Sequence, residues 1–171
     1  GTAICEFAAA AEVFYRFICL KAAEYKVMFT AQGKAVEAFD EENRIKAARE
    51  NIKRVQAEDL ITLIEGDATE ELKKLSPGYD FIFMDAAKGQ YGLFFEEAIG
   101  LLKPGGVLLC DNVLQDGDVL ESRFAVTRRN RTIHSRMREY LYALKHNAGL
   151  ETAILNIGDG MSLSIKKNEK W

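Results

Sequence analysis

The sequence has few cysteines, few prolines and no long apolar run, and each shortage narrows the class of protein. Its three cysteines (Cys5, Cys19 and Cys110) are odd in number and fit neither a disulfide framework nor the spacing of a zinc site. No apolar stretch approaches the roughly 20 residues that cross a bilayer, and Arg16 interrupts even the short run from Val13 to Leu20. The first residues lack the basic start and the cleavage pattern of a signal peptide. We therefore expect a cytoplasmic protein.

Size and composition are those of an ordinary globular domain, but the charge is unevenly spread. The chain has 171 residues, 48% of them hydrophobic and 29% charged, so we expect one domain over residues 1–171. Between Arg123 and His146, six arginines and one lysine accompany a single acid, Glu139. That segment carries about +6, and the remainder about −9, since the whole chain carries −3. The asymmetry indicates either an anionic partner or simply a solvated helix face.

Apolar periodicity and glycine-rich breaks predict alternating helices and strands. Helices are expected over residues 40–54, 69–75, 91–102 and 122–146, and the apolar residues between Cys5 and Ala35 also suit a helix. Strands are expected over residues 61–64, 79–84 and 107–110, followed by a hairpin of residues 152–157 and 161–165. The order predicts an α/β fold, a Rossmann-like doubly wound sheet that is mostly parallel, with an antiparallel C-terminal hairpin.

Polar residues follow three of the expected strands. They are Gly66-Asp67-Ala68, Asp85 with Lys88 one short turn later, and Asp111-Asn112. Ligands of open α/β sheets bind outside the carboxyl ends of the strands, so these residues are expected to line one crevice. Carboxylate and amide oxygens suit Mg²⁺, Mn²⁺ or Ca²⁺ better than zinc. The alternative for each aspartate is an ordinary cap or turn residue.

Four motifs resemble parts of a known family. The run Tyr79-Asp80-Phe81-Ile82-Phe83-Met84-Asp85-Ala86-Ala87-Lys88 is similar to a signature of the metal-dependent O-methyltransferases, which include catechol and caffeoyl-CoA methyltransferases and bacterial relatives. Leu101-Leu102-Lys103-Pro104-Gly105-Gly106-Val107, followed by Asp111-Asn112-Val113, resembles the next signature. Gly66-Asp67-Ala68 resembles the adenine-contacting turn, and Gly1-Thr2-Ala3-Ile4 the end of the glycine-rich first loop. The resemblance runs from about Asp40 to Lys167.

The resemblance implies S-adenosylmethionine as methyl donor and Mg²⁺ or Mn²⁺ as metal. It implies metal ligation by Asp85, Asp111 and Asn112, and makes Lys88 and Asp85 the catalytic candidates, with Lys88 as general base. The implied cofactor-binding residues are Gly1, Thr2, Glu37, Gly66, Asp67, Ala68 and Asp85.

The N-terminal part departs from the family pattern. Members carry helices and a first strand ahead of the Gly-Thr motif, whereas this sequence begins on it. After Ile4 the family continues with glycine and a small or hydroxyl residue, and here the chain reads Cys5-Glu6-Phe7. The acid that holds the ribose hydroxyls would fall near Ala38, with Glu37 beside it.

The segment from Ser122 to His134 bears on the substrate. It resembles a bacterial branch that methylates 5-hydroxyuridine to 5-methoxyuridine in tRNA, and its arginines suit phosphates. A second hypothesis is an enzyme for small catechol-like or acyl-CoA substrates. A third is a catalytically silent fragment that binds RNA or a partner chain. Relatives often pair, so we expect a homodimer.

Three other polar residues are expected to lie outside the chemistry. Cys110 is interpreted as a small buried residue, Asp159 as a turn residue between two glycines, and His134 as a surface or phosphate-side histidine.

Overall fold

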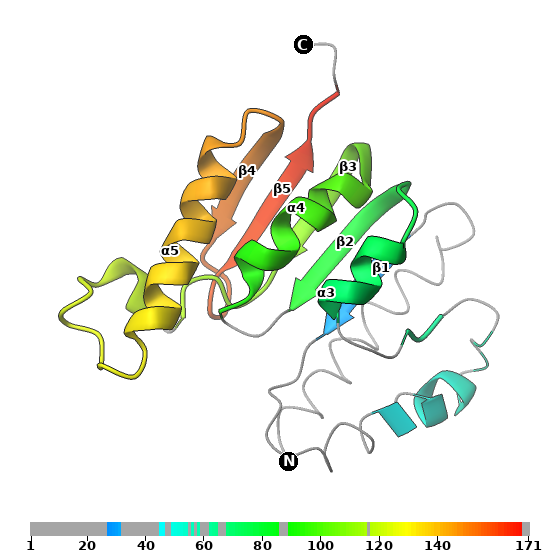
Figure 1. Cartoon of the computed structure of the whole chain (residues 1–171), viewed down its shortest axis with the longest axis horizontal. Coiled ribbons are helices and arrows are strands. Elements are labelled where there is room, and N and C mark those ends of the chain that lie inside the picture. The colour runs from blue at the N-terminus through cyan, green and yellow to red at the C-terminus, as the bar shows by residue number, and fades with distance from the viewer. Residues whose placement is uncertain are drawn as a thin grey trace.

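In the computed structural model, a five-stranded mixed sheet organises the chain (Figure 1). The structure describes residues 27–31, 45–46, 49–54, 56, 58, 62–64, 68–85, 89–115 and 117–168. The strands, in their order across the sheet, are β1 (Val27–Ala31), β2 (Tyr79–Asp85), β3 (Leu102–Cys110), β5 (Met161–Lys166) and β4 (Leu150–Leu155). The first three are parallel, whereas β5 is antiparallel to both of its neighbours. The predicted α/β fold class is confirmed.

Three α-helices lie on one face of this sheet, as Figure 1 shows. They are α3 (Ala68–Glu71), which continues as the 3₁₀ turn η1 (Leu72–Lys74), α4 (Tyr91–Leu101) and α5 (Arg131–His146). A second 3₁₀ turn, η2 (Asp118–Leu120), precedes α5. Residues 45–46 and 49–54 are helical, within the helix expected over residues 40–54. Among the described residues, no helix is long and apolar enough to span a bilayer.

The hydrophobic core lies between the sheet and the inner faces of α4 and α5. Each helix is amphipathic and turns its apolar stripe toward the strands. The fully buried side chains include Ile82 and Met84 from β2, Leu108 from β3, Tyr91 from α4, and Met137, Tyr140 and Leu144 from α5. At about 25 cal/mol per Å² of apolar surface, burial of each such side chain is worth roughly 1.5–3 kcal/mol, and the conformational entropy of ordering offsets most of it. This packing holds the ends of β2 and β3 in place.

The strand β3 begins five residues earlier than the sequence predicts. The expected turn at Pro104-Gly105-Gly106 lies inside it, as an irregularity at which the pairing register with β2 shifts. A Cβ atom on Gly106 would lie 2.8 Å from the carbonyl oxygen of Lys103 and 3.0 Å from that of Tyr79. The glycine therefore permits a close approach of two backbones, which no sequence period reveals.

One expected strand is wrong, and one observed strand was not predicted. The expected strand over residues 61–64 is absent from its described part, residues 62–64, where Leu63 and Ile64 are exposed. The strand that was not predicted is β1, which pairs with β2 from Val27↔Phe81 to Ala31↔Asp85. The helix expected in the preceding segment rests on apolar residues from Phe7 to Ile18, which lie outside the described residues. A short apolar run predicts burial but not which segment becomes the neighbour of a given strand.

The long C-terminal helix also begins later than expected. Residues 122–130 form turns, in which the amide of Ala125 donates to the carbonyl of Ser122 and that of Asn130 to the carbonyl of Thr127. The helix starts at Arg131, with Asn130 at its N-cap position. The final hairpin is confirmed, its strands shifted by one or two residues from the expected ends.

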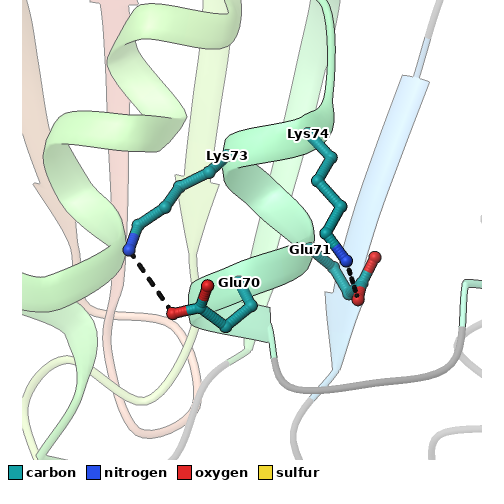
Figure 2. Close-up of polar contacts among 4 residues, drawn as sticks. All are labelled: Glu70, Glu71, Lys73 and Lys74. Atoms are coloured by element: carbon teal, nitrogen blue, oxygen red, sulfur yellow. Dashed lines mark hydrogen bonds and ion pairs between the residues drawn. The ribbon is translucent and has the colours of Figure 1, made fainter.

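Ion pairs accompany the short helix that precedes β2. Figure 2 shows Glu70 paired with Lys73 at 3.5 Å and Glu71 with Lys74 at 2.7 Å, both three residues apart. The hydrogen bond to Glu71 and its charge raise the pKa of Lys74 above its usual value. Because these side chains are largely exposed, the pairs contribute little, and the burial of Leu72 anchors the helix instead.

Candidate active site at the carboxyl ends of β2 and β3

Two carboxylates lie at the carboxyl ends of neighbouring parallel strands: Asp85 is the last residue of β2, and Asp111 is the first residue after β3. Met84 pairs with Cys110 in the register of β2 and β3, so Asp85 and Asp111 occupy the next positions of the two strands. The amide of Asp111 donates to the carbonyl of Met84 at 3.2 Å, which extends the pairing to the site. Burial, followed by the nearby charge of Asp111, raises the pKa of Asp85. The structure therefore brings together the two acids that sequence analysis selected.

The third predicted ligand, Asn112, lies in a sharp turn directly after Asp111. Its φ is +55°, a left-handed conformation that asparagine tolerates better than most residues. The backbone N–H of Asn112 donates to Oδ1 of Asp111 at 2.8 Å. Both side chains are half-buried. The turn thus places two oxygen-bearing side chains beside the end of β2.

Tyr91 is a part of this site that sequence reasoning missed. It opens α4, is 2% exposed, and its hydroxyl donates to the backbone carbonyl of Asp111 at 2.6 Å. Its ring lies 5.3 Å from that of Tyr140, whose hydroxyl donates to Sγ of Cys110 at 2.9 Å. Two tyrosines therefore hold the last residue of β3 and the first residue after it.

Cys110 is buried, and its surroundings make its thiol unreactive. Burial raises the pKa of its thiol to about 12, although the hydrogen bond from Tyr140 acts in the opposite direction. A thiol with such a pKa carries almost no thiolate near neutral pH and is a poor nucleophile. The interpretation of Cys110 as a small buried residue is confirmed.

The chemistry of the donor set fits a hard divalent cation. Two carboxylates and one amide oxygen are the ligand types that Mg²⁺ and Mn²⁺ prefer, with waters or substrate oxygens completing the shell. The described residues contain no group of three or more histidine, cysteine, aspartate or glutamate side chains that could hold an ion. Within the described part of the chain, Asp85, Asp111 and Asn112 are therefore the side chains that could hold a cation at this end of the sheet.

The remaining predicted residues divide into two groups. Ala68 is described: it is half-buried and opens α3, which runs opposite to β2, so Ala68 lies toward the end of the sheet where β2 finishes (Figure 1). Six others lie outside the described residues: Gly1, Thr2, Glu37, Gly66, Asp67 and Lys88. The position of the ribose acid near Ala38 lies outside them too.

The arginine-rich segment follows the site along the chain. Figure 1 shows the loop between η2 and α5 extending beyond the end of the sheet at which β2 finishes. Arg123, Arg128 and Arg129 are exposed in it, and Phe124 is 85% exposed. His134, expected at the surface, is instead only 2% exposed, because the first turns of α5 and the preceding loop enclose it. Asp159 lies in the hairpin turn, as expected.

Comparisons with known proteins agree with this architecture. A sequence model of a family described as O-methyltransferase matches residues 13–167. Tapetum-specific methyltransferase 1 of Arabidopsis thaliana is 32% identical over 118 residues, which cover 67% of this chain and 51% of that protein. Other curated relatives are named caffeoyl-CoA O-methyltransferase and catechol O-methyltransferase. The chain spans about half the length of the first curated relatives that it matches.

Solved structures show the same fold. A putative caffeoyl-CoA O-methyltransferase from Staphylococcus aureus is 27% identical with a TM-score of 0.72, and the match covers 97% of this chain and 93% of that one. A methyltransferase from Podospora anserina, described as bound to S-adenosylhomocysteine, is 25% identical with a TM-score of 0.66, covering 83% of this chain and 60% of that one.

Proposed function

The chain belongs to the O-methyltransferase family, and on that basis we propose that it transfers a methyl group from S-adenosylmethionine to an acceptor hydroxyl beside Asp85, Asp111 and Asn112. The observation that carries the proposal is the convergence of two half-buried carboxylates and an amide at the ends of adjacent parallel strands. S-adenosylhomocysteine in a solved relative supports the choice of methyl donor. We propose one methyltransferase domain over residues 1–171.

The reaction is a direct displacement. The acceptor oxygen forms a bond to the methyl carbon, the carbon–sulfur bond breaks, and its electron pair stays on sulfur, so the sulfonium becomes a neutral thioether. A divalent cation, when bound, lowers the pKa of the acceptor hydroxyl and fixes its position. We assign the hydroxyl proton to Lys88 as general base, following the sequence resemblance. The task of the chain is then to align donor and acceptor.

Asp85, Asp111 and Asn112 are the proposed ligands of Mg²⁺ or Mn²⁺. Their oxygens are hard donors. Burial, and after it the nearby charge of Asp111, raises the pKa of Asp85, so repulsion between the two carboxylates is the smaller part of that rise. A divalent cation between them would relieve that repulsion. Two hydrogen bonds hold Asp111 in its turn before any cation binds. The backbone N–H of Asn112 donates to the Asp111 carboxylate, and the Tyr91 hydroxyl donates to the Asp111 backbone carbonyl.

Replacing one ligand tests this assignment. Asp111→Ala removes a charged ligand, so we expect metal-dependent methyl transfer to fall at least a hundredfold, and Mn²⁺ affinity, followed by electron paramagnetic resonance, to fall with it. Glu151→Ala removes an exposed carboxylate on β4 and serves as the matched control, with little expected change. Full activity of the parent chain in excess chelator would rule out the metal mechanism.

For the acceptor, we propose 5-hydroxyuridine in tRNA. The exposed arginines and Phe124 offer contacts for phosphates and for a stacked base, in a loop beyond the end of the sheet at which β2 finishes. The uridine 5-hydroxyl and its neighbouring carbonyl can chelate a cation as a catechol does. This proposal also rests on the resemblance of residues 122–134 to the tRNA-modifying branch.

A small catechol-like or acyl-CoA acceptor is the second candidate, and the names of the curated relatives favour it. The two candidates differ in their dependence on salt. Binding of tRNA through arginines should weaken steeply as salt rises, whereas turnover of a neutral catechol should change little. A homodimer is proposed in either case, and sedimentation would test it.

A further inference from the structure

A hollow of about 420 Å³ lies between the arginine-rich loop and the first half of α5. It is lined by Arg123 from the loop and by His134, Ser135, Arg138 and Glu139 from the helix. Two guanidinium groups thus accompany one carboxylate around a cavity that already contains a hydroxyl group and an imidazole ring. Such a lining favours an anion with several acceptor oxygens.

The wall of the hollow is built by contacts to one backbone carbonyl. Nε2 of His134 donates to the carbonyl of Glu121 at 3.1 Å, because a carbonyl oxygen can only accept. The same oxygen accepts a long hydrogen bond, 3.4 Å, from Arg138. His134 and Arg138 therefore fix the end of η2 against α5, and they keep the loop that carries Arg123 in place.

Two groups around the hollow are left with capacity for a ligand. Nδ1 of His134 is buried and has no hydrogen-bond partner within the described part of the chain. Because Nε2 is the donor, Nδ1 of the neutral imidazole accepts, so its partner would be a hydroxyl group or a water and not a phosphate oxygen. Arg123 forms no hydrogen bond or ion pair with any described residue, and its side chain is exposed. A buried polar atom without a partner is uncommon in folded proteins and is found at sites that bind ligands or water.

We propose that this hollow is a phosphate subsite for the acceptor substrate. The inference rests on the proposed methyl transfer and specifies where the acceptor is held. Phosphate has the charge and the acceptor oxygens that Arg123 and Arg138 can satisfy, and Ser135 offers a further donor. The segment from Ser122 to Arg131 adds three more arginines and no acid. The backbone of an RNA, with phosphates spaced along the chain, fits this run of positive charge better than an acyl-CoA, whose charge is confined to one diphosphate and one 3′-phosphate.

A pair of charge-matched variants tests the subsite. Arg123→Gln removes a lining cation that has no structural contact with a described residue, and Lys145→Gln removes an exposed cation from the last turn of the same helix. We expect Arg123→Gln to weaken binding of a fluorescent RNA stem-loop roughly tenfold and to lower the salt slope by about one. Lys145→Gln should change binding by about twofold or less, and both variants should melt at the parent temperature. Equal effects of the two variants on RNA binding, or no effect of Arg123→Gln on either RNA or coenzyme A, would overturn the subsite.

A second arm identifies the source of the phosphate. If Arg123→Gln weakens coenzyme A relative to dephospho-coenzyme A and leaves the RNA unchanged, the subsite stands and belongs to an acyl-CoA substrate. If the RNA depends on Arg123 but receives no methyl group, the subsite stands and the proposed RNA methylation fails. Methylation of RNA that is insensitive to Arg123→Gln would support the proposed function and contradict the subsite.

Discussion

Tyr91 connects the start of α4 to the turn that carries two of the proposed ligands. Its hydroxyl donates to the carbonyl of Asp111, not to the carboxylate, so it fixes the backbone and leaves the side-chain oxygens of Asp111 available. The next residue, Asn112, adopts a positive φ, which the surroundings have to hold. We infer that Tyr91 is a positioning residue for the site.

Removing the Tyr91 hydroxyl should weaken the turn that carries Asp111 without creating a cavity in the core. Tyr91→Phe keeps the ring in its contact with Tyr140 but leaves the Asp111 carbonyl without this donor. We expect a loss of about 1 kcal/mol in the free energy of unfolding and a severalfold loss of Mn²⁺ affinity. Urea titration and electron paramagnetic resonance measure the two effects.

Tyr142→Phe is the control for that prediction. Tyr142 lies in α5 and is 66% exposed, so the loss of its hydroxyl should change neither the free energy of unfolding nor the affinity for Mn²⁺. A Tyr91→Phe variant with parent affinity for Mn²⁺ would show that the turn after β3 does not need the hydroxyl.

The residues of the site were predictable to different degrees. Asp85, Asp111 and Asn112 could be selected because a strand ends before each and because carboxyl ends of parallel strands share one edge. Tyr91 could not, since its ring fits the apolar stripe of α4 and its partner is a backbone atom 20 residues away. His134 was misplaced for a related reason: its burial comes from a loop whose turns the sequence suggested were helical.

At the scale of elements, the C-terminal hairpin supports the loop that leaves the site. The amide of Val113 donates to the carbonyl of Gly160, and that of Leu114 to the carbonyl of Asp159, each at 3.0 Å. These bonds join the hairpin turn to the two residues that follow Asn112. The hairpin therefore supports the site as well as extending the sheet.

Gly160 is the tightest point of that contact. Its φ is +79°, and a Cβ atom there would overlap the side chain of Leu114. Gly160→Ala combines a left-handed alanine with overpacking, so we expect a loss of about 2–4 kcal/mol in the free energy of unfolding. Thermal or urea denaturation followed by circular dichroism measures it.

Gly158→Ala provides the matched control in the same turn. Gly158 has a φ of +58° but nothing within 4 Å of its would-be Cβ, so only the backbone cost of roughly 1–2 kcal/mol is expected. If the two variants lose the same stability, the contact between the hairpin turn and Leu114 is not tight in solution.

The elements themselves were largely predictable where local pattern and packing agree. β2, α4 and the hairpin strands follow their apolar periods and glycine breaks closely. The errors fall where pairing decides: β1 takes the place beside β2, and β3 extends backward through Pro104 because the two backbones approach closely at Gly106. The start of α5 was misjudged because residues 122–130 close turns among themselves.

At the scale of the whole molecule, the fold and the charge distribution point to the same end of the sheet. Asp85, Asp111 and Asn112 lie at the carboxyl ends of β2 and β3, and the arginine-rich loop extends beyond that end (Figure 1). Carboxylates that could hold a cation and arginines that could hold an anionic substrate at the same end of the sheet would suit the proposed metal-dependent methylation of a phosphate-bearing acceptor. The assignment to the O-methyltransferase family is confirmed, whereas the metal dependence and the tRNA acceptor that the resemblance implies stay predictions.

The most direct test of the account is methyl transfer itself. The purified chain is incubated with methyl-labelled S-adenosylmethionine, Mg²⁺ and tRNA that carries 5-hydroxyuridine, with a simple catechol in a parallel tube. We predict label in the tRNA that disappears when a chelator is added. Label only in the catechol would move the assignment to small acceptors. Label that persists in chelator, or no label in either tube, would contradict metal-dependent methyl transfer by this chain.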